Sequence, residues 1–150
     1  MSRYPDAPLV VEAFEGEWRF LSHFYESPVE YRGVYYRTIE HAFQAAKTLD
    51  LAAREKIRQV HEPAEAKRLG RGVRLRPGWE VIKLDIMRHL LEQKFTVYPT
   101  LRRNLLGTGE AELIEGNRWN DRYWGVCGGQ GENHLGRLIM EIRAGLRERA

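Results

Sequence analysis

The chain of 150 residues has a single cysteine, Cys127, and contains no long apolar run. One cysteine excludes an internal disulfide and fits a reducing cytoplasm. The apolar runs are too short to span a membrane, and the first ten residues, MSRYPDAPLV, lack the apolar segment of an export signal. We therefore expect a cytoplasmic protein with no membrane association.

The motifs of several enzyme classes are also absent. No two histidines have the i, i+4 spacing with which a helix binds a metal ion. The chain has no G-x-S-x-G motif, Walker loop or dinucleotide-binding fingerprint. Cys127 has no histidine beside it in the sequence, which disfavours a catalytic thiol. We expect neither a metal nor another cofactor.

Neither sign of charge dominates, because 24 Lys and Arg stand against 21 Asp and Glu. The net charge of +3 permits an anionic ligand but is too small to indicate an architectural nucleic-acid-binding protein. The length fits one domain with a real core. We expect a single domain over residues 1–150, with its core over about 14–147.

Two kinds of periodicity predict the fold class. Residues 8–36 have short aromatic and β-branched runs typical of strands and turns, with a hairpin turn at Arg32-Gly33. Residues 111–132 indicate a short strand and a long structured loop. The remaining segments are helical in pattern, at 38–48, 51–60, 63–70, 78–96, 100–106 and 133–148. The sequence predicts an α+β protein, predominantly α-helical, with a small N-terminal hairpin region and five to six helices.

The first predicted helix carries three polar residues in one row. At about 100° per residue, Glu40, Gln44 and Lys47 lie within roughly 60° of one another around the helix axis. Thr38 is a plausible N-cap, so Glu40 lies in the first turn, where the helix dipole favours a carboxylate. The row is either a solvated stripe or the wall of a pocket, and the helix alone does not decide between them.

A second candidate site lies in the loop GNRWNDRYWGVCGGQGEN. Asp121 stands among Trp119, Tyr123 and Trp124, and aromatic faces beside a carboxylate are typical of sites for sugars or nucleobases. In the alternative interpretation the tryptophans belong to the core and Asp121 forms a turn. The glycines that follow lead into a helix near Asn133, which suits a phosphate or a simple capped helix. The segment GRGVRLRPGW offers Arg71 and Arg74 as further phosphate ligands, or is a solvated loop.

Four segments, taken in order, resemble the YbiA-like or NADAR family from about Phe14 to Arg147. They are FLSHFYESPVEYRGVYYRTIEHAFQAAK, GRGVRLRPGWEVIKLDIMRHLLEQKF, LLGTGEAELIEGNRWNDRYWG and NHLGRLIMEIR. The family motif E-H-x-x-Q-x-x-K matches Glu40, His41, Gln44 and Lys47. The motif N-x-x-D-x-x-W-G matches Asn117 or Asn120, Asp121, Trp124 and Gly125. The family usually has Asn at the position of His23, so a contact made by that amide is not carried over.

The resemblance implies an N-glycosidase that cleaves the bond between the anomeric carbon of a phosphorylated ribose and a nitrogen base. The implied substrates are ADP-ribosylated guanine, free or in nucleic acid, or phosphoribosylamino-pyrimidine intermediates of riboflavin synthesis. A non-catalytic module that binds ADP-ribose or nucleotides is the alternative. We expect a small-molecule phosphoribosyl or ADP-ribosyl ligand; the sequence does not identify protein partners.

The expected site divides into two sets of residues. We expect catalysis from Glu40, Lys47 and Asp121. Lys47 is either a nucleophile that forms an imine with the opened ribose or a charge partner of Glu40 or phosphate. The substrate-binding set is His41, Gln44, Arg71, Trp79, Asn120, Trp124, Gly125, Gly129 and Asn133.

Overall fold

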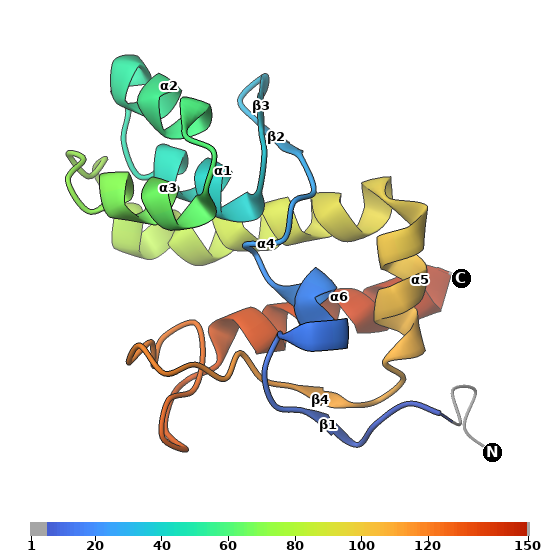
Figure 1. Ribbon diagram of the computed structural model, residues 1–150. Helices are drawn as coiled ribbons and strands as arrows, with labels where there is room; N and C mark the ends of the chain where they lie inside the picture. Colours follow the sequence, from blue (N-terminus) through green and yellow to red (C-terminus); the bar gives the residue numbers. More distant parts are fainter. Residues whose placement is uncertain (1–5, 150) are drawn as a thin grey trace. The chain divides into compact units, whose positions relative to one another are not determined.

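The computed structural model describes residues 6–149. In chain order its elements are β1 (Val10–Val11), a 3₁₀ helix (Gly16–Leu21), β2 (Val29–Tyr31), β3 (Val34–Tyr36), α1 (Ile39–Ala46), α2 (Leu51–Gln59), α3 (Pro63–Gly70), α4 (Trp79–Val97), α5 (Pro99–Gly107), β4 (Glu112–Leu113) and α6 (His134–Arg149) (Figure 1). These helices and two small sheets confirm the predicted α+β, predominantly helical class. The six predicted helices are confirmed to within two residues at each end.

Contacts between Cα atoms divide the chain into two compact units. One unit is His23–Lys94, which holds the β2–β3 hairpin, α1, α2, α3 and most of α4. Among the described residues, the other unit combines residues 6–22 with residues 95–149. The boundaries of one domain over residues 1–150 stay a prediction. Among residues 6–149, no helix has the length and apolar character needed to cross a membrane.

The hairpin of the first unit has the predicted two-residue turn. Arg32 has φ 53° and Gly33 has φ 80°, and positive φ at both central residues matches the twist of a tight hairpin. β2 and β3 pair antiparallel, with Tyr31 opposite Val34. The hairpin, α2 and α3 all contact α1, and every residue of α1 is buried. This central helix is therefore the element on which the unit is built.

The first unit also buries a lysine. α4 places Met87, Leu90, Leu91 and Lys94 in the core, each no more than 1% exposed. The Lys94 ammonium lies 5.3 Å from the centre of the Tyr25 ring, a cation–π distance. Burial lowers the pKa of Lys94 to about 7. Its side chain is thus part of the packing of this unit.

The second unit pairs distant parts of the sequence. β1 and β4 form a parallel pair in which Val11 lies opposite Leu113. On α6, the buried Arg143 donates from Nη1 to Thr108 Oγ1 at 2.9 Å and from Nη2 to the Ala111 carbonyl at 2.8 Å. These bonds tie α6 to the segment between α5 and β4. The long loop predicted after the short strand is confirmed between β4 and α6.

One segment differs from the prediction. The pattern of residues 8–36, which includes the run WRFLSHF, predicts strands and turns, but Gly16–Leu21 forms a 3₁₀ helix. Trp18 N–H donates to the Glu15 carbonyl at 2.9 Å, which is the i to i+3 bond of that helix. Phe20 and Leu21 are both buried although they are neighbours, whereas a half-buried strand would alternate.

Candidate active site

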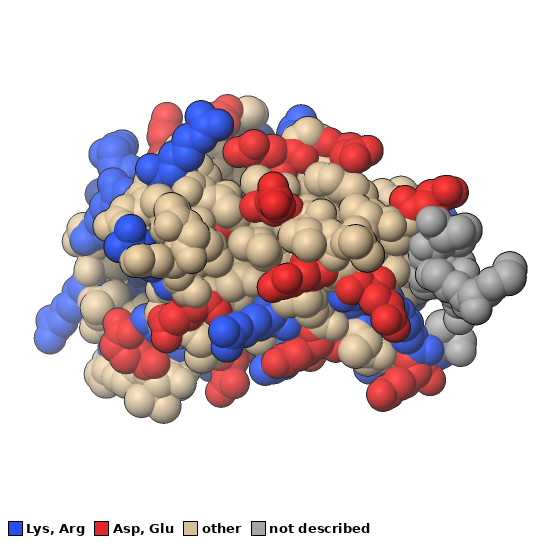
Figure 2. Space-filling view, turned by 90° about the horizontal axis from the view of Figure 1, so that it is seen from below, with Lys and Arg blue, Asp and Glu red and all other residues tan. Residues whose placement is uncertain are grey.

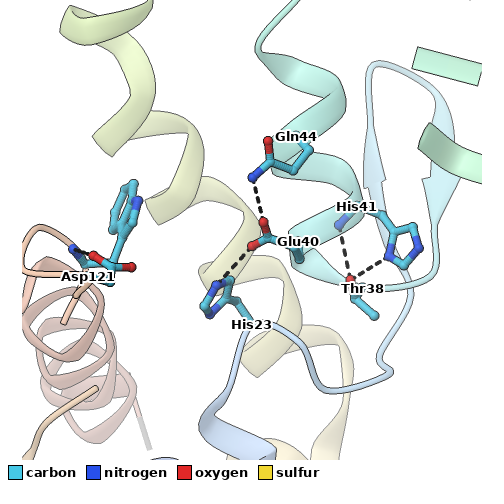
Figure 3. A network of polar contacts seen from close by, with 7 residues as sticks. His23, Thr38, Glu40, His41, Gln44 and Asp121 are labelled. Carbon is cyan, nitrogen blue, oxygen red and sulfur yellow. Dashed lines mark hydrogen bonds and ion pairs between the residues drawn. The ribbon is translucent and has the colours of Figure 1, made fainter. Parts of the chain in front are cut away.

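The start of α1 is fixed by a threonine and a histidine. Thr38 is the N-cap, with Oγ1 accepting from the His41 main-chain N–H at 3.1 Å. The His41 ring places Nδ1 2.8 Å from Thr38 Oγ1 (Figure 3). Its Nε2 lies 2.9 Å from the Val60 carbonyl. Nε2 donates to that carbonyl, so Nδ1 accepts from the threonine hydroxyl. Burial lowers the pKa of His41, which keeps this ring neutral.

Both ring nitrogens of His41 thus bind protein groups, and the side chain positions α1 within its unit. The predicted contact of His41 with substrate stays a prediction. The sequence signal for the structural role was the T-x-x-H spacing, in which the N-cap hydroxyl meets the residue three positions on.

Glu40 lies directly after this cap and is held by two donors. Its Oε2 is 3.0 Å from His23 Nε2, and its Oε1 accepts from Gln44 Nε2 at 2.6 Å (Figure 3). The Glu40 main-chain N–H also donates to the His23 carbonyl at 3.1 Å. Glu40 is 3% exposed and Gln44 is 5% exposed, so the solvated-stripe alternative is wrong for both.

The environment keeps the Glu40 carboxylate ionised. Burial by itself raises the pKa of Glu40. The hydrogen bond and charge of His23, the hydrogen bond of Gln44 and the charge of Lys67 lower this pKa, and together they outweigh the effect of burial. The net result is a pKa below the usual value for a glutamate. The arrangement provides a buried negative charge at a fixed position, which can stabilise positive charge that develops on a bound ligand.

The Gln44 amide has one buried atom without a partner. Its Oε1 forms no hydrogen bond with any of the residues that the structure describes. The amide lies against Gly70 at the end of α3, where a Cβ atom would be 1.8 Å from Gln44 Oε1. Only glycine leaves room for the amide here. Because an unsatisfied buried acceptor is costly, this oxygen is suited to a donor from a ligand.

Lys47 is the C-cap of α1 and is partly exposed. Burial lowers its pKa, the charge of Glu40 raises it, and the positive charges of Arg71, Lys67 and Lys83 lower it. The net pKa is below that of an ordinary lysine. Within residues 6–149, Lys47 forms no ion pair with Glu40. This environment increases the fraction of neutral amine, the form that can act as a nucleophile.

The basic groups that act on Lys47 include two that the sequence analysis did not single out. Lys67 lies one helical turn before Arg71, and Lys83 lies one turn after Trp79. The i, i+4 spacing from two predicted residues was the signal that could have found them. Lys83 also forms an ion pair with Glu80. Together with Arg71, the two lysines place positive charge near Lys47, which suits an anionic ligand.

Trp79 occupies a packed position in the same unit. It begins α4, is 5% exposed, and its ring centre lies 5.1 Å from that of Phe43 at an interplanar angle of 54°. Such tilted pairs are typical of aromatic packing in cores. The predicted stacking of Trp79 on a ligand stays a prediction.

In the other unit, Asp121 forms the turn considered in the sequence analysis. Its Oδ1 accepts from the main-chain N–H groups of Tyr123 at 3.2 Å and Trp124 at 2.9 Å. The Asn117 amide accepts from Asp121 N–H at 3.0 Å and donates to the Asp121 carbonyl at 2.8 Å. These bonds use only one carboxylate oxygen. Oδ2 is left for another partner, so the turn and a ligand contact are compatible.

The other predicted residues of this loop differ in how the protein uses them. Gly125 is buried, and a Cβ atom there would lie 2.0 Å from the Glu115 carbonyl oxygen. The Asn133 amide donates to the Leu113 carbonyl and accepts from Glu115 N–H, each at 2.9 Å. Both residues hold the loop against β4. Their predicted contacts with substrate stay predictions.

Three further residues lie at the surface of the loop. Asn120 and Gly129 are exposed, with φ of 64° and 77°. Trp124 is partly exposed, and its ring centre is 4.9 Å from that of Tyr123 in an edge-to-face contact. An accessible aromatic ring is available for stacking. Within residues 6–149, no group of three or more His, Cys, Asp or Glu side chains is placed to hold a metal ion.

Comparison with known proteins identifies the family. The model of the NADAR domain matches residues 12–147. The N-glycosidase YbiA of Escherichia coli is 45% identical over 81% of this chain and 78% of its own length. An N-glycosidase of Nostoc punctiforme is 36% identical over 84% of each chain. A riboflavin biosynthesis protein of Vibrio vulnificus is 36% identical over 87% of this chain but only 36% of its own length.

The fold agrees with a solved relative. The NMR structure of E. coli YbiA matches with a TM-score of 0.83 and 39% identity, covering 96% of this chain and 87% of that one. The family predicted from the sequence motifs is thus confirmed. The chain belongs to the NADAR domain family.

Proposed function

We propose that the chain hydrolyses the bond between the anomeric carbon of a phosphorylated ribose and a nitrogen base. Two relatives of the chain are named N-glycosidases, which confirms the predicted class of enzyme. The observation that carries the proposal is the buried, ionised Glu40, held by His23 and Gln44 on the helix that ends at Lys47.

The charges that develop in this reaction fit the site. As the base departs, positive charge develops on the sugar and negative charge on the base. The fixed Glu40 carboxylate stabilises the first without reorganising. Gln44 Oε1 accepts from a ribose hydroxyl, and Lys67, Arg71 and Lys83 attract the phosphate. We assign ribose or base recognition to Asp121 Oδ2 and stacking on the base to Trp124.

Lys47 provides a covalent route. Its neutral amine attacks the anomeric carbon while the carbon–nitrogen bond to the base breaks and the base leaves with a proton. The sugar ring then opens to an imine on Lys47. Water adds to the imine, and its hydrolysis releases the sugar and regenerates the amine. The lowered pKa of Lys47 favours this role over that of a charge partner.

The class of substrate rests on chemistry that the proposed ligands share. ADP-ribosylated guanine and phosphoribosylamino-pyrimidines both present a phosphorylated ribose joined to nitrogen. The face seen in Figure 2 carries both acidic and basic side chains with uncharged residues between them. This face does not favour a polyanion, and the net charge of +3 is small. We therefore propose a small-molecule substrate, and the single cysteine fits a location in the reducing cytoplasm.

One experiment separates the candidates. The protein is incubated with ADP-ribosylated guanosine or with a ribosylaminopyrimidine phosphate, and the released base is measured by chromatography. Release from one compound identifies the substrate. If both compounds bind tightly and no base is released, the protein is a non-catalytic nucleotide-binding module. Neither binding nor release would refute the proposed ligand class.

A further inference from the structure

A pocket lies in the unit His23–Lys94, at the hairpin and along one face of α4. Its volume is about 430 Å³. The lining residues are Tyr31, Arg32, Arg76, Ile82, Asp85, Ile86 and His89. None of them belongs to the row of Glu40, Gln44 and Lys47. The proposed reaction therefore assigns no role to the residues of this pocket.

Arginines gather around Tyr31 at one side of this pocket. The Tyr31 hydroxyl accepts from Arg76 Nη1 at 2.9 Å. The guanidinium carbons of Arg32 and Arg54 lie 6.0 and 5.3 Å from the centre of the Tyr31 ring. Burial raises the pKa of Tyr31, but hydrogen bonds from Arg32 and Arg76 and the charges of Arg76 and Arg54 lower it overall. The guanidinium groups of Arg32, Arg54 and Arg76 thus all lie close to the Tyr31 side chain.

Two of these guanidinium groups face the pocket itself. Arg76 is held by Tyr31, by a bond to the Ala46 carbonyl at 3.4 Å, and by its main-chain N–H on the Lys47 carbonyl at 2.7 Å. Arg32 extends from the exposed hairpin turn. Planar guanidinium groups bind phosphate oxygens in pairs, and one fixed and one adaptable arginine are suited to a doubly charged phosphate.

The face of α4 adds two other kinds of contact. Asp85 and His89 are one helical turn apart and both exposed, and they can accept from hydroxyl or amino groups. Ile82 and Ile86 provide apolar surface for a ring. The carboxylate of Asp85 also repels a bare phosphate ion, so the pocket selects an anion that carries hydrogen-bond donors.

We propose that this pocket binds a phosphate monoester of mononucleotide size, separate from the site of the N-glycosidase reaction. The volume is near the lower end of the roughly 300–1,000 Å³ of small-molecule sites, which suits one nucleotide and not a dinucleotide. Arg32 and Arg76 bind the phosphate, Asp85 accepts from the sugar hydroxyls, and the isoleucines contact the base. The inference does not depend on the proposed function.

The test is an NMR titration of the ¹⁵N-labelled protein with AMP, compared with inorganic phosphate. We expect saturable shifts of the amide signals of Gly33, Ile86 and His89, with AMP binding more tightly than phosphate. Arg32→Asn, chosen because asparagine tolerates positive φ, should weaken AMP binding about tenfold or more. Lys56→Gln removes the same charge from an exposed position outside the pocket and should leave binding unchanged.

A second variant tests selectivity. Asp85→Asn removes the repulsion, so it should strengthen phosphate binding and reduce the preference for AMP. Shifts confined to Glu40 and its neighbours would place AMP in the other site and overturn the proposal. Equal weakening of AMP binding by Arg32→Asn and Lys56→Gln would mean that AMP binds through general surface charge, and this would also overturn the proposal. The absence of binding would also overturn it.

Discussion

Glu40→Gln tests the proposed reaction most directly, because it removes the charge while keeping the shape of the side chain. We expect turnover to fall at least about a hundredfold, which corresponds to about 2.7 kcal/mol of transition-state stabilisation. The reason is that the carboxylate is buried and ionised, so water cannot take over its stabilisation of the positive charge that develops on the sugar.

The structure also predicts that this variant folds. An amide at position 40 would meet two donors, His23 Nε2 and Gln44 Nε2. If the Gln44 amide rotates by half a turn, its Oε1, which has no partner, accepts from the new amide nitrogen. The His23 bond to the remaining oxygen is kept. Both bonds then have ordinary strength in place of a charge-assisted bond, which costs about 1 kcal/mol for each.

The pH dependence of unfolding provides an independent check. Glu40 has a lowered pKa in the folded protein, so its ionisation stabilises the fold at neutral pH and this contribution disappears as the pH falls through the acidic range. The variant should lose that part of the pH dependence. Thermal unfolding across pH and single-turnover rates are the two measurements.

A matched control is available in α3. Glu65 is also an acidic residue in a first helical turn, but it is exposed. Glu65→Gln removes an exposed carboxylate and should leave turnover unchanged. If Glu40→Gln keeps nearly the original rate with an intact melting curve, Glu40 acts only on the helix dipole and the proposed mechanism is wrong.

Further predictions concern the residues around this carboxylate. Gly70→Ala should displace the Gln44 amide and destabilise the protein by about 1–3 kcal/mol, measured by chemical denaturation. His23→Leu removes a donor that lowers the pKa of the carboxyl group, so the acid limb of the rate profile should move to higher pH. Lys47 should be trapped as a covalent sugar adduct by borohydride during turnover, with the adduct absent in Lys47→Ala. Asp121→Asn keeps the turn acceptor but loses the charge, so it should lower turnover without lowering the melting temperature.

Each of these predictions has a control or a contrary outcome. Gly72→Ala should be neutral, because a Cβ atom there makes only an ordinary contact. His23→Asn keeps a donor and should keep most of the activity. A fully active Lys47→Arg with no trapped adduct would leave Lys47 as a charge partner. Unaltered turnover per folded molecule in Asp121→Asn would make that residue purely a turn former.

The helices were predictable because local signals agree with one another. Pro63 and Pro99 stand at the first positions of α3 and α5, and Asp50 caps α2 through bonds to two main-chain N–H groups. The hairpin followed from Arg32-Gly33. The 3₁₀ helix differs from the prediction because the aromatic residues of this run favour a strand locally. A half-buried strand turns neighbouring side chains to opposite faces, whereas Phe20 and Leu21 are both buried.

The sequence predicts the row of polar residues on α1, but it does not predict the residues from other segments that contact this row. Helical spacing brings Glu40 and Gln44 together, and the family motif identifies both. The partner His23 lies 17 positions earlier in the chain, and no local period connects it to Glu40. The close approach of Gly70 to Gln44 likewise arises from packing between α1 and α3, which the sequence does not encode at a fixed spacing.

The cap formed by Thr38 and His41 has a consequence for the entropy of ligand binding. Three hydrogen bonds join Thr38, His41 and Val60, and they restrain the backbone that carries Glu40 before any ligand arrives. Fixing a residue of flexible chain costs about 1–2 kcal/mol. Here the turn is ordered when the protein folds, so this entropy cost is part of the free energy of folding and not of ligand binding. A ligand that reaches Glu40 meets an ordered turn, and its interaction energy is not reduced by having to order one.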